Sequence, residues 1–417
     1  MKKKVVIIGG GIIGLSSAYY LHKSGHQVTV VDKSNFDSGA SYVNAGYVTP
    51  SHFIPLAAPG MISKGIKWMF NSSSPFYMKP QWDTEFFKWA WSFHRSSTEA
   101  KVKKATPVLK DFNILSRDLF EELQRSEDLG KFHYERSGLL MAYKTEKGAE
   151  SEIEVAEIAK KEGLDVVVLS QSELQALQPD AAIDAMGAAY YRCDGHSTPM
   201  QIMAKLYDYL KASGVEILKN TEVTDIDYTN GIIKSITTSS GKIEADEFVI
   251  ASGSWSPLLL KKLGVNLKVQ PGKGYRIDVK RPTGITIPAI LHEAKIAITP
   301  MDGYTRFAGT MEFSGLNHVI RKERVNAIAD AAKSFYTKME FQESELEKAQ
   351  CGLRPVSPDG LPFIGRTAAL KNCVIGTGHA MMGWSLGPAT GKLITEVIDG
   401  TKTSMAIDAF DPDRKFS

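Results

Sequence analysis

The stretch 5–32 constrains the fold of this chain more than any other. The apolar, β-branched run VVII leads directly into Gly9-x-Gly11-x-x-Gly14, and a helical pattern follows. A second apolar run then ends in Asp32, about 20 residues beyond the glycines. This order predicts a βαβ unit of the dinucleotide-binding type, in which the helix N-terminus receives a pyrophosphate and the acid receives ribose hydroxyls.

Each glycine has a separate physical reason. Gly9 permits the tight turn, Gly11 lets a pyrophosphate approach the backbone, and Gly14 lets the helix pack on the strand. Asp32 would repel a 2′-phosphate. FAD and NAD both remain compatible with this stretch alone, and a purely structural glycine turn is the alternative.

Composition excludes several classes of protein. A chain of 417 residues exceeds one hydrophobic core, which predicts two domains, and a net charge of +3 is too small to indicate nucleic acid. No apolar window approaches the length of a membrane span. The nine histidines lack helical ligand spacing, so no metal is expected. Three widely spaced thiols predict a reducing, cytoplasmic compartment without disulfides, namely Cys193, Cys351 and Cys373.

The middle of the chain has a different pattern. A loop over 33–50 is rich in small residues, which lets backbone approach a flat group. The stretch 269–279 predicts a strand interrupted at Pro271–Gly274, and 322–339 predicts a helix. These segments indicate an antiparallel sheet with flanking helices, inserted into an α/β nucleotide domain.

The C-terminal part contains the second informative region. Gly352-Leu-Arg354-Pro is followed by Gly376-Thr-Gly378-His379 and by a helix over 388–398. This end of the chain combines a strand, a glycine-rich turn and a helix. The pattern implies that the chain returns to the nucleotide held by the N-terminal βαβ unit.

With both regions considered, the sequence resembles the FAD-dependent amine and amino-acid oxidoreductases of the D-amino-acid oxidase type. That group includes glycine oxidase, sarcosine oxidase and the bacterial D-amino-acid dehydrogenases. The resemblance covers nearly the whole chain, and its carriers are 9–32, Ser41-Tyr-Val-Asn44-Ala-Gly46, Ala251-Ser-Gly253-Ser-Trp255, Gly352-Leu-Arg354-Pro and Gly376-Thr-Gly378-His379. The loop over 44–46 and the stretch 54–70 are most similar to the dehydrogenases.

The resemblance implies an α/β and α+β fold, in which an FAD-binding Rossmann-like domain carries an inserted antiparallel-sheet substrate domain. The FAD-binding domain would consist of residues 1–50, 196–265 and 345–417. The substrate domain would consist of residues 51–195, with a helical insert, and 266–344.

The resemblance also implies a noncovalent FAD, because Cys351 is one position away from the cysteine that tethers flavin in some relatives. The residues expected to hold FAD are Gly9, Gly11, Ile12, Ile13, Gly14, Asp32, Lys33, Ser41, Asn44, Ala45, Gly46, Val223, Ala251, Gly253, Trp255, Gly352, Gly378, Met381, Met382, Gly383 and Trp384.

Three residues are expected in the substrate site. Arg354 matches the arginine that holds a substrate carboxylate, a role that suits a planar guanidinium; the alternative is a structural pair with Asp359. Tyr275 matches a hydroxyl beside that carboxylate, with ordinary packing as the alternative. His379 is expected to pack near the flavin more than to act as a base. The apolar run 380–382 favours apolar or cyclic substrate side chains.

The implied function is oxidative deamination of D-amino acids, cyclic ones such as D-proline or hydroxy-D-proline included, by hydride transfer from Cα to flavin N5. Electrons would pass to a quinone or carrier. The alternatives are an oxygen-using glycine or sarcosine oxidase and a non-catalytic flavin-binding component. The stretch 54–70, with Lys64 and Lys67, is expected to form a lid or to make weak peripheral contact with the inner face of a membrane.

Overall fold

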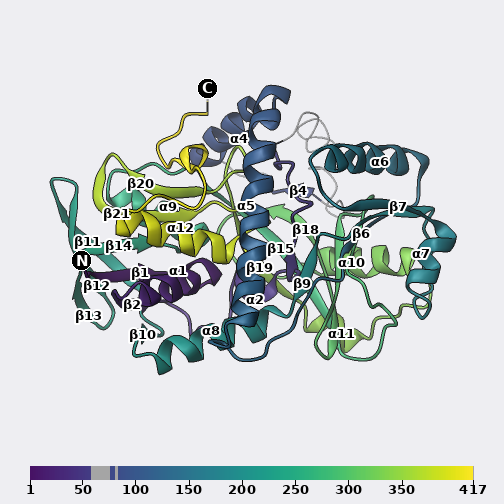
Figure 1. Ribbon diagram of the computed structural model, residues 1–417, viewed down its shortest axis with the longest axis horizontal. Helices are drawn as coiled ribbons and strands as arrows, with labels where there is room; N and C mark the ends of the chain where they lie inside the picture. The colour runs from purple at the N-terminus through teal and green to yellow at the C-terminus, as the bar shows by residue number, and fades with distance from the viewer. Residues whose placement is uncertain (58–75, 80–82, 417) are drawn as a thin grey trace.

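The computed structural model describes residues 1–57, 76–79 and 83–416 (Figure 1). The stretch 58–75, with Lys64 and Lys67, lies outside the described residues. Within the described ranges, no helix combines the length and the apolar character that a membrane crossing requires.

A six-stranded sheet forms one half of the molecule, with the order β10-β2-β1-β14-β21-β20. Five of its strands run parallel, and β20 pairs antiparallel with β21. Its bounds are β1 Lys4–Ile8, β2 Gln27–Val31, β10 Glu216–Leu218, β14 Glu247–Ile250, β20 Phe363–Thr367 and β21 Leu370–Thr377. Strands from both ends of the sequence therefore meet in one sheet, as the predicted return of the chain requires.

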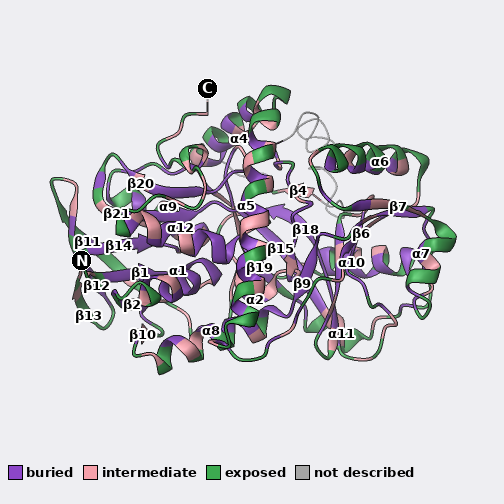
Figure 2. Ribbon diagram, viewed as in Figure 1, coloured by how far each residue is buried: buried purple, intermediate pink, exposed green. Residues whose placement is uncertain are grey.

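The alternation of apolar residues along β1 places a separate layer on each face of this sheet. Val5 and Ile7 belong to a core shared with the helices α1 Ile12–Lys23, α5 Glu99–Arg125, α8 Pro199–Ala212 and α12 Gly387–Asp399. Val6 and Ile8 belong to a core on the other side, with β11 Val223–Thr229, β12 Ile232–Thr238, β13 Gly241–Glu244 and α9 Ser256–Lys262 nearby. The central strands are accordingly buried (Figure 2).

A larger, mainly antiparallel sheet forms the other half, with the order β19-β15-β18-β17-β16-β6-β8-β7 and with β4 paired to β18. Helix α10, Lys322–Phe335, buries Val325, Ile328 and Ala332 in the core of this half. The strands are β4 Phe76–Met78, β6 Leu139–Tyr143, β7 Val166–Ser170, β8 Gly187–Tyr191, β15 Gln270–Val279, β16 Ala289–Leu291, β17 Ile296–Met301, β18 Tyr304–Phe313 and β19 Gln350–Val356. The predicted fold class is confirmed.

The remaining elements connect and cover the two halves. The long helix α5, Glu99–Arg125, runs between them in Figure 1. A small sheet has the order β3-β9-β5. The bounds of the remaining elements are β3 Tyr47–Val48, β5 Tyr134–Glu135, β9 Gly195–Ser197, α2 Ala40–Val43, α4 Thr84–Ser96, α6 Glu146–Lys161, α7 Gln171–Leu177, α11 Glu343–Glu347, η1 Gly253–Trp255 and η2 Asp408–Phe410.

One sequence prediction about the strands was wrong. Pro271–Gly274 does not interrupt the predicted strand, because β15 continues through it from Gln270 to Val279. Strand β19 pairs with all four of these residues on one side, whereas β18 pairs with Gly272 and Lys273 on the other and its register shifts at Gly274. The division of the chain into five domain segments stays a prediction.

Candidate functional site

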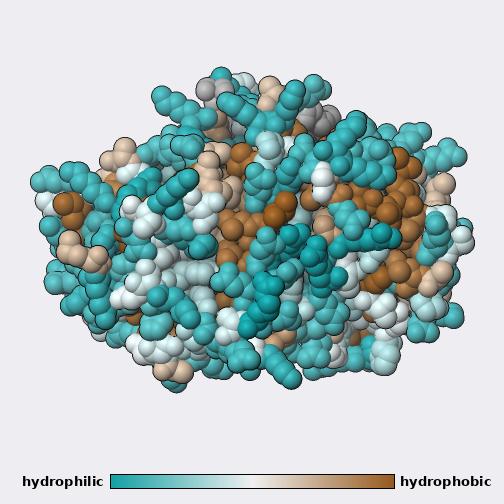
Figure 3. Space-filling view, in the orientation of Figure 1, coloured by the Kyte–Doolittle hydropathy of each residue, from teal (hydrophilic) through white to brown (hydrophobic). Residues whose placement is uncertain are grey.

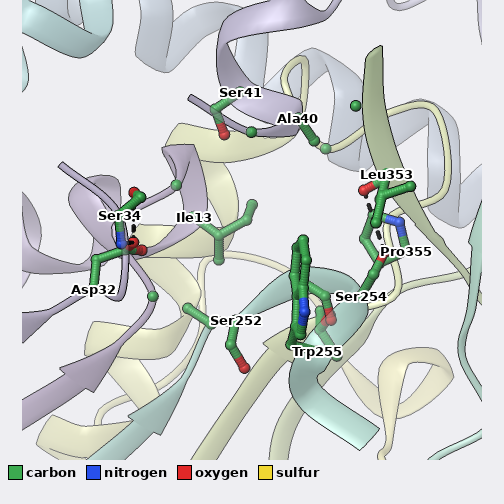
Figure 4. A pocket seen from close by; sticks show the side chains of 18 of the residues that line it. Ile13, Asp32, Ser34, Ala40, Ser41, Ser252, Ser254, Trp255, Leu353 and Pro355 are labelled. Atoms are coloured by element: carbon green, nitrogen blue, oxygen red, sulfur yellow. Dashed lines mark hydrogen bonds between the residues drawn. The ribbon is translucent and has the colours of Figure 1, made fainter. Parts of the chain in front are cut away.

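A pocket of about 920 Å³ lies where the carboxyl ends of β1, β2 and β14 face strand β19 of the larger sheet. Figure 4 shows its wall, with Asp32 and Ser34 at one end and Leu353 and Pro355 at the other. Ligands in open α/β sheets bind at this edge, beyond the carboxyl ends of parallel strands. The structure thus joins the N-terminal and C-terminal motifs in one cavity.

In the glycine turn at one end of the pocket, Gly9 and Gly14 are required by the backbone fold, whereas Gly11 leaves space for a ligand. Gly9 has φ +114°, and a Cβ there would lie 2.4 Å from the Ala251 carbonyl oxygen. A Cβ on Gly14 would lie 1.8 Å from the Gly9 oxygen. On Gly11 the nearest atom would be Ser41 Oγ at 3.1 Å, so this position faces the cavity. Helix α1 begins there, and the N–H groups of its first turn have no acceptor within the helix, although that of Ile12 donates to Ser41 Oγ at 2.9 Å.

Asp32 fastens this turn to the end of β2. Its Oδ2 accepts a hydrogen bond from the Gly10 backbone at 2.6 Å. Its Oδ1 accepts from the backbone and the hydroxyl of Ser34 at 2.7 and 2.6 Å, as drawn in Figure 4. The carboxylate lines the pocket in a fixed orientation.

Helix α2 and the loop after it form another wall of the pocket, and their carbonyls are held from outside the pocket. Arg306 of β18 donates from NH1 to the carbonyls of Tyr42 and Asn44 at 3.0 and 2.8 Å. Thr299 donates to the Ala45 carbonyl at 2.7 Å. These bonds connect the larger sheet to the pocket loop. Sequence reasoning missed them because nothing near Arg306 in the sequence indicates its partner.

Arg354, on β19, is the pocket's distinctive charge. Its guanidinium lies over Gly274, where a Cβ would lie 2.1 Å from NH1, and NH1 donates to the Thr310 carbonyl at 2.8 Å. Burial lowers the pKa of Arg354 to about 10, which still leaves it charged at neutral pH. No ion pair joins Arg354 to an acid in the described part of the chain. Asp359 pairs with Arg414 at 2.8 and 2.9 Å, so the alternative of a structural Arg354–Asp359 pair is wrong.

Tyr275 lies on the other face of the sheet from Arg354. The register pairs Tyr275 with Cys351 and Gly272 with Arg354, and side chains alternate faces along a strand. The Tyr275 hydroxyl donates to Glu312 at 2.8 Å, and burial, with that carboxylate beside it, raises its pKa. The expectation of a hydroxyl beside the substrate carboxylate is therefore wrong for Tyr275, and the alternative of core packing describes it.

His379 follows β21 and lies in the pocket wall, buried and neutral. Its Nε2 lies 2.9 Å from the Thr390 hydroxyl, which itself donates to the Leu386 carbonyl at 2.8 Å. Nε2 is therefore the protonated nitrogen, and its N–H donates a hydrogen bond to the Thr390 hydroxyl. Burial lowers the pKa of His379 to about 3.

Most of the residues expected from the sequence line the pocket. Those that line it are Gly9, Gly11, Ile12, Ile13, Asp32, Lys33, Ser41, Asn44, Val223, Ala251, Gly253, Trp255, Gly352, Arg354, His379, Met381, Gly383 and Trp384. Those outside its lining are Gly14, Ala45, Gly46, Tyr275, Gly378 and Met382.

Several lining residues were missed. Ser252 and Ser254 lie within the quoted motif 251–255, which could have indicated them. His318 could not have been found, because it comes from a loop without a motif. It stacks on Trp255, with ring centroids 6.0 Å apart, and Lys33 Nζ lies 3.9 Å from the centroid of the Trp255 ring.

Comparisons with known proteins agree with this geometry. The family model of the FAD dependent oxidoreductases (DAO) matches residues 4–397. A D-amino acid dehydrogenase of Vibrio atlanticus is 31% identical, over 97% of this chain and 98% of that protein. A D-amino acid dehydrogenase of Bradyrhizobium diazoefficiens is also 31% identical, over 99% and 98%.

The fold has a close structural counterpart as well. The crystal structure of glycine oxidase from Geobacillus kaustophilus has a TM-score of 0.78 and 22% identity, with 99% of both chains covered. The family match spans both halves of the molecule and the whole pocket between them. This chain belongs to the family of FAD-dependent oxidoreductases.

Proposed function

We propose that this protein is an FAD-dependent D-amino-acid dehydrogenase, which oxidises the Cα–N bond of a D-amino acid to an imino acid. The single observation that carries the proposal is Arg354, a guanidinium in the pocket wall with only a backbone carbonyl as its hydrogen-bond partner among the described residues. A charge in such a place requires an anion, and a carboxylate matches its planar fork. The full-length relatives are D-amino acid dehydrogenases, which supports the same substrate class.

FAD fits the remaining wall. The α1 N-terminus and Gly11 would hold the pyrophosphate, and Asp32 the adenosine ribose. The loops at 41–46 and 378–384 would hold the flavin ring beside Arg354. When bound, FAD supplies the two-electron acceptor for the hydride that leaves Cα.

The chain's own contribution is mainly orientation. Arg354 would fix the carboxylate so that the Cα–H bond points toward the flavin, and such positioning contributes roughly 7–11 kcal/mol to lowering a barrier. The amine must be neutral before hydride leaves. His379 donates a hydrogen bond from Nε2 to the Thr390 hydroxyl and is kept neutral by burial, so we assign it to the wall of the site and not to base catalysis.

The proposed preference for apolar or cyclic side chains follows from the surroundings of Arg354. Ala380 lines the pocket and belongs to an apolar cluster with Trp89, Met311 and Val356. Trp89 donates its indole N–H to the Val356 carbonyl at 2.9 Å, which fixes its ring. A polar or charged side chain near this cluster would lose hydration without a partner.

The test is anaerobic bleaching of the flavin by a panel of D-amino acids, with Arg354→Lys and Arg354→Met compared with the wild type. Removal of one side of a buried charge pair costs about 2–5 kcal/mol, which corresponds to a fall in kcat/KM of about 30- to 5,000-fold. Arg354→Lys should lose much of this, because an ammonium cannot reproduce the fork. Arg366→Lys, at a pair with Glu247 outside the pocket lining, is the matched control.

Unchanged kcat/KM in both Arg354 variants, with flavin retained, would contradict the assignment. Bleaching by glycine or sarcosine and rapid reoxidation in air would favour the oxidase. A flavin that no amine reduces would favour a non-catalytic binding component.

We further infer that a quinone or an electron carrier reoxidises the flavin, with weak peripheral contact to a membrane. The observation in favour lies on α4, where Phe87 and Trp91 are 53% and 63% exposed at helical spacing. The face in Figure 3 shows other apolar patches, beside α5 and near β7. Sedimentation with anionic liposomes at low salt should pellet the wild type more than a Phe87→Ser/Trp91→Ser variant. Equal and negligible pelleting would contradict membrane contact.

A further inference from the structure

We propose that His133, Glu135 and His196 form a binding site for a divalent metal ion of the Zn²⁺ type. The three residues lie outside the pocket lining, on the small sheet that contains β5 and β9. Two imidazoles and one carboxylate are a ligand set that suits zinc, with water in the fourth position.

Strand register places two of the three side chains on one face, and a ring contact brings the third beside them. Glu135 of β5 is paired directly with His196 of β9, and residues that oppose each other project to the same side. His133 lies just before β5, and its ring centroid is 5.2 Å from that of His196. One ligand atom from each residue lies within 4.8 Å of the others.

The distances are close to those of a bound site. His133 Nε2 and Glu135 Oε1 are 3.4 Å apart. Metal–ligand distances of about 2.0–2.1 Å in a tetrahedron give ligand separations of roughly 3.4 Å. One edge of the tetrahedron is therefore already formed, and the His196 ligand atom lies within 4.8 Å of the other two.

Both imidazoles are oriented by other hydrogen bonds, as metal-binding histidines usually are. His133 Nδ1 lies 2.8 Å from the Thr198 hydroxyl, which leaves Nε2 toward Glu135. His196 Nδ1 lies 3.0 Å from the Ser137 hydroxyl, and the Pro300 carbonyl also hydrogen-bonds the ring. Metal binding at His196 replaces one of these bonds and keeps the other as an anchor.

Access also suits a metal. Glu135 is 58% exposed, which leaves a path for the ion and room for a water ligand. A plain His133–Glu135 ion pair is the alternative. The expectation of no metal rested on helical spacing, which cannot detect ligands on two strands that lie far apart in the sequence.

The site would fasten β5 to β9 behind the pocket. Ser197, next to His196, donates to the Gly46 carbonyl and accepts from the Trp384 indole at 2.9 Å. An ion here stabilises the folded protein by mass action, because the unfolded chain lacks the paired strands.

The experiment titrates the chelator-treated, dialysed holoprotein with ZnCl₂ at pH 7.5 by calorimetry, with thermal melts in parallel. We expect one ion per chain, at least tenfold weaker binding in His133→Ala and in Glu135→Gln, and a zinc-dependent rise in Tm that both variants lose. His94→Ala and Glu85→Gln, on helix α4 outside the proposed metal site, are the matched controls and should bind as the wild type does. No saturable binding by the wild type, or equal binding by His133→Ala and Glu135→Gln, would overturn the proposal in favour of the ion pair.

Discussion

Substitution of Arg306 tests whether the larger sheet sets the shape of the cofactor pocket. Its side chain is fully buried, and its Nε and NH2 donate to Asp278 at 2.8 and 3.1 Å. NH1 holds two carbonyls of the pocket loop. Burial lowers the pKa of Arg306 to about 10, so it remains a cation at neutral pH. Arg306→Lys keeps the charge near Asp278 and loses the fork.

The expected magnitude follows from the two lost carbonyl contacts. Each hydrogen bond from a charged group contributes about 1.5–3 kcal/mol, so Arg306→Lys should lower the free energy of unfolding of the apoprotein by about 3 kcal/mol or more. FAD binding should weaken at least tenfold, because a loosened loop has to be ordered when FAD binds, and about 1.4 kcal/mol of ordering corresponds to tenfold in Kd. Thr299→Val, which frees the Ala45 carbonyl, should have a smaller effect in the same direction.

The assay combines urea unfolding of the apoprotein with flavin titration by fluorescence quenching. Arg366→Lys serves as the control for the loss of a guanidinium fork outside the pocket. A lower free energy of unfolding with unchanged FAD affinity would show that Arg306 supports the fold and not the pocket. If both quantities remained unchanged, the assignment of Arg306 to the loop would be refuted.

Three further predictions follow from the same geometry. Gly11→Val should fold and purify colourless, because its side chain enters the cavity. Gly14→Val should fail to fold, because its Cβ meets the Gly9 carbonyl. A yellow Gly11→Val protein with full flavin content would contradict this prediction. Tyr275→Phe should lower the free energy of unfolding by about 1–3 kcal/mol, because Glu312 loses a buried donor, and should leave KM unchanged. A large rise in KM would show that Tyr275 does contact the substrate. Burial lowers the pKa of His52 to about 4, although the charge of Glu152 opposes this shift. Between pH 4 and 6.5 the unfolded state therefore binds more protons than the folded state, and stability is lost as the pH falls through that window. His52→Gln should remove up to about 1.4 kcal/mol per pH unit of this dependence in urea unfolding at a series of pH values, and equal slopes for both proteins would exclude it.

The sequence was most informative where an element and its chemistry are local. The βαβ unit could be predicted because the glycines, the helix and Asp32 lie within one short stretch, and Arg354 because it lies in a motif. Tyr275 was placed on the wrong side because the face of a strand residue depends on pairing with β19, whose register the sequence does not contain. Arg306 and His318 were missed for a related reason: their partners are hundreds or tens of residues away, and only the folded chain brings them together.

The position of β21 and α12 has a consequence for biosynthesis. Strand β21 pairs with β14 in the six-stranded sheet, and a Cβ on Gly391 of α12 would lie 2.5 Å from the Ser16 backbone of α1. The first βαβ unit leaves the ribosome early and gains β10 and β14 as sheet neighbours, but β14 lacks β21 and helix α1 lacks α12 until residues near 391 have been synthesised. A nascent chain therefore cannot enclose FAD during most of translation, and loading of the cofactor becomes a late, essentially post-translational event.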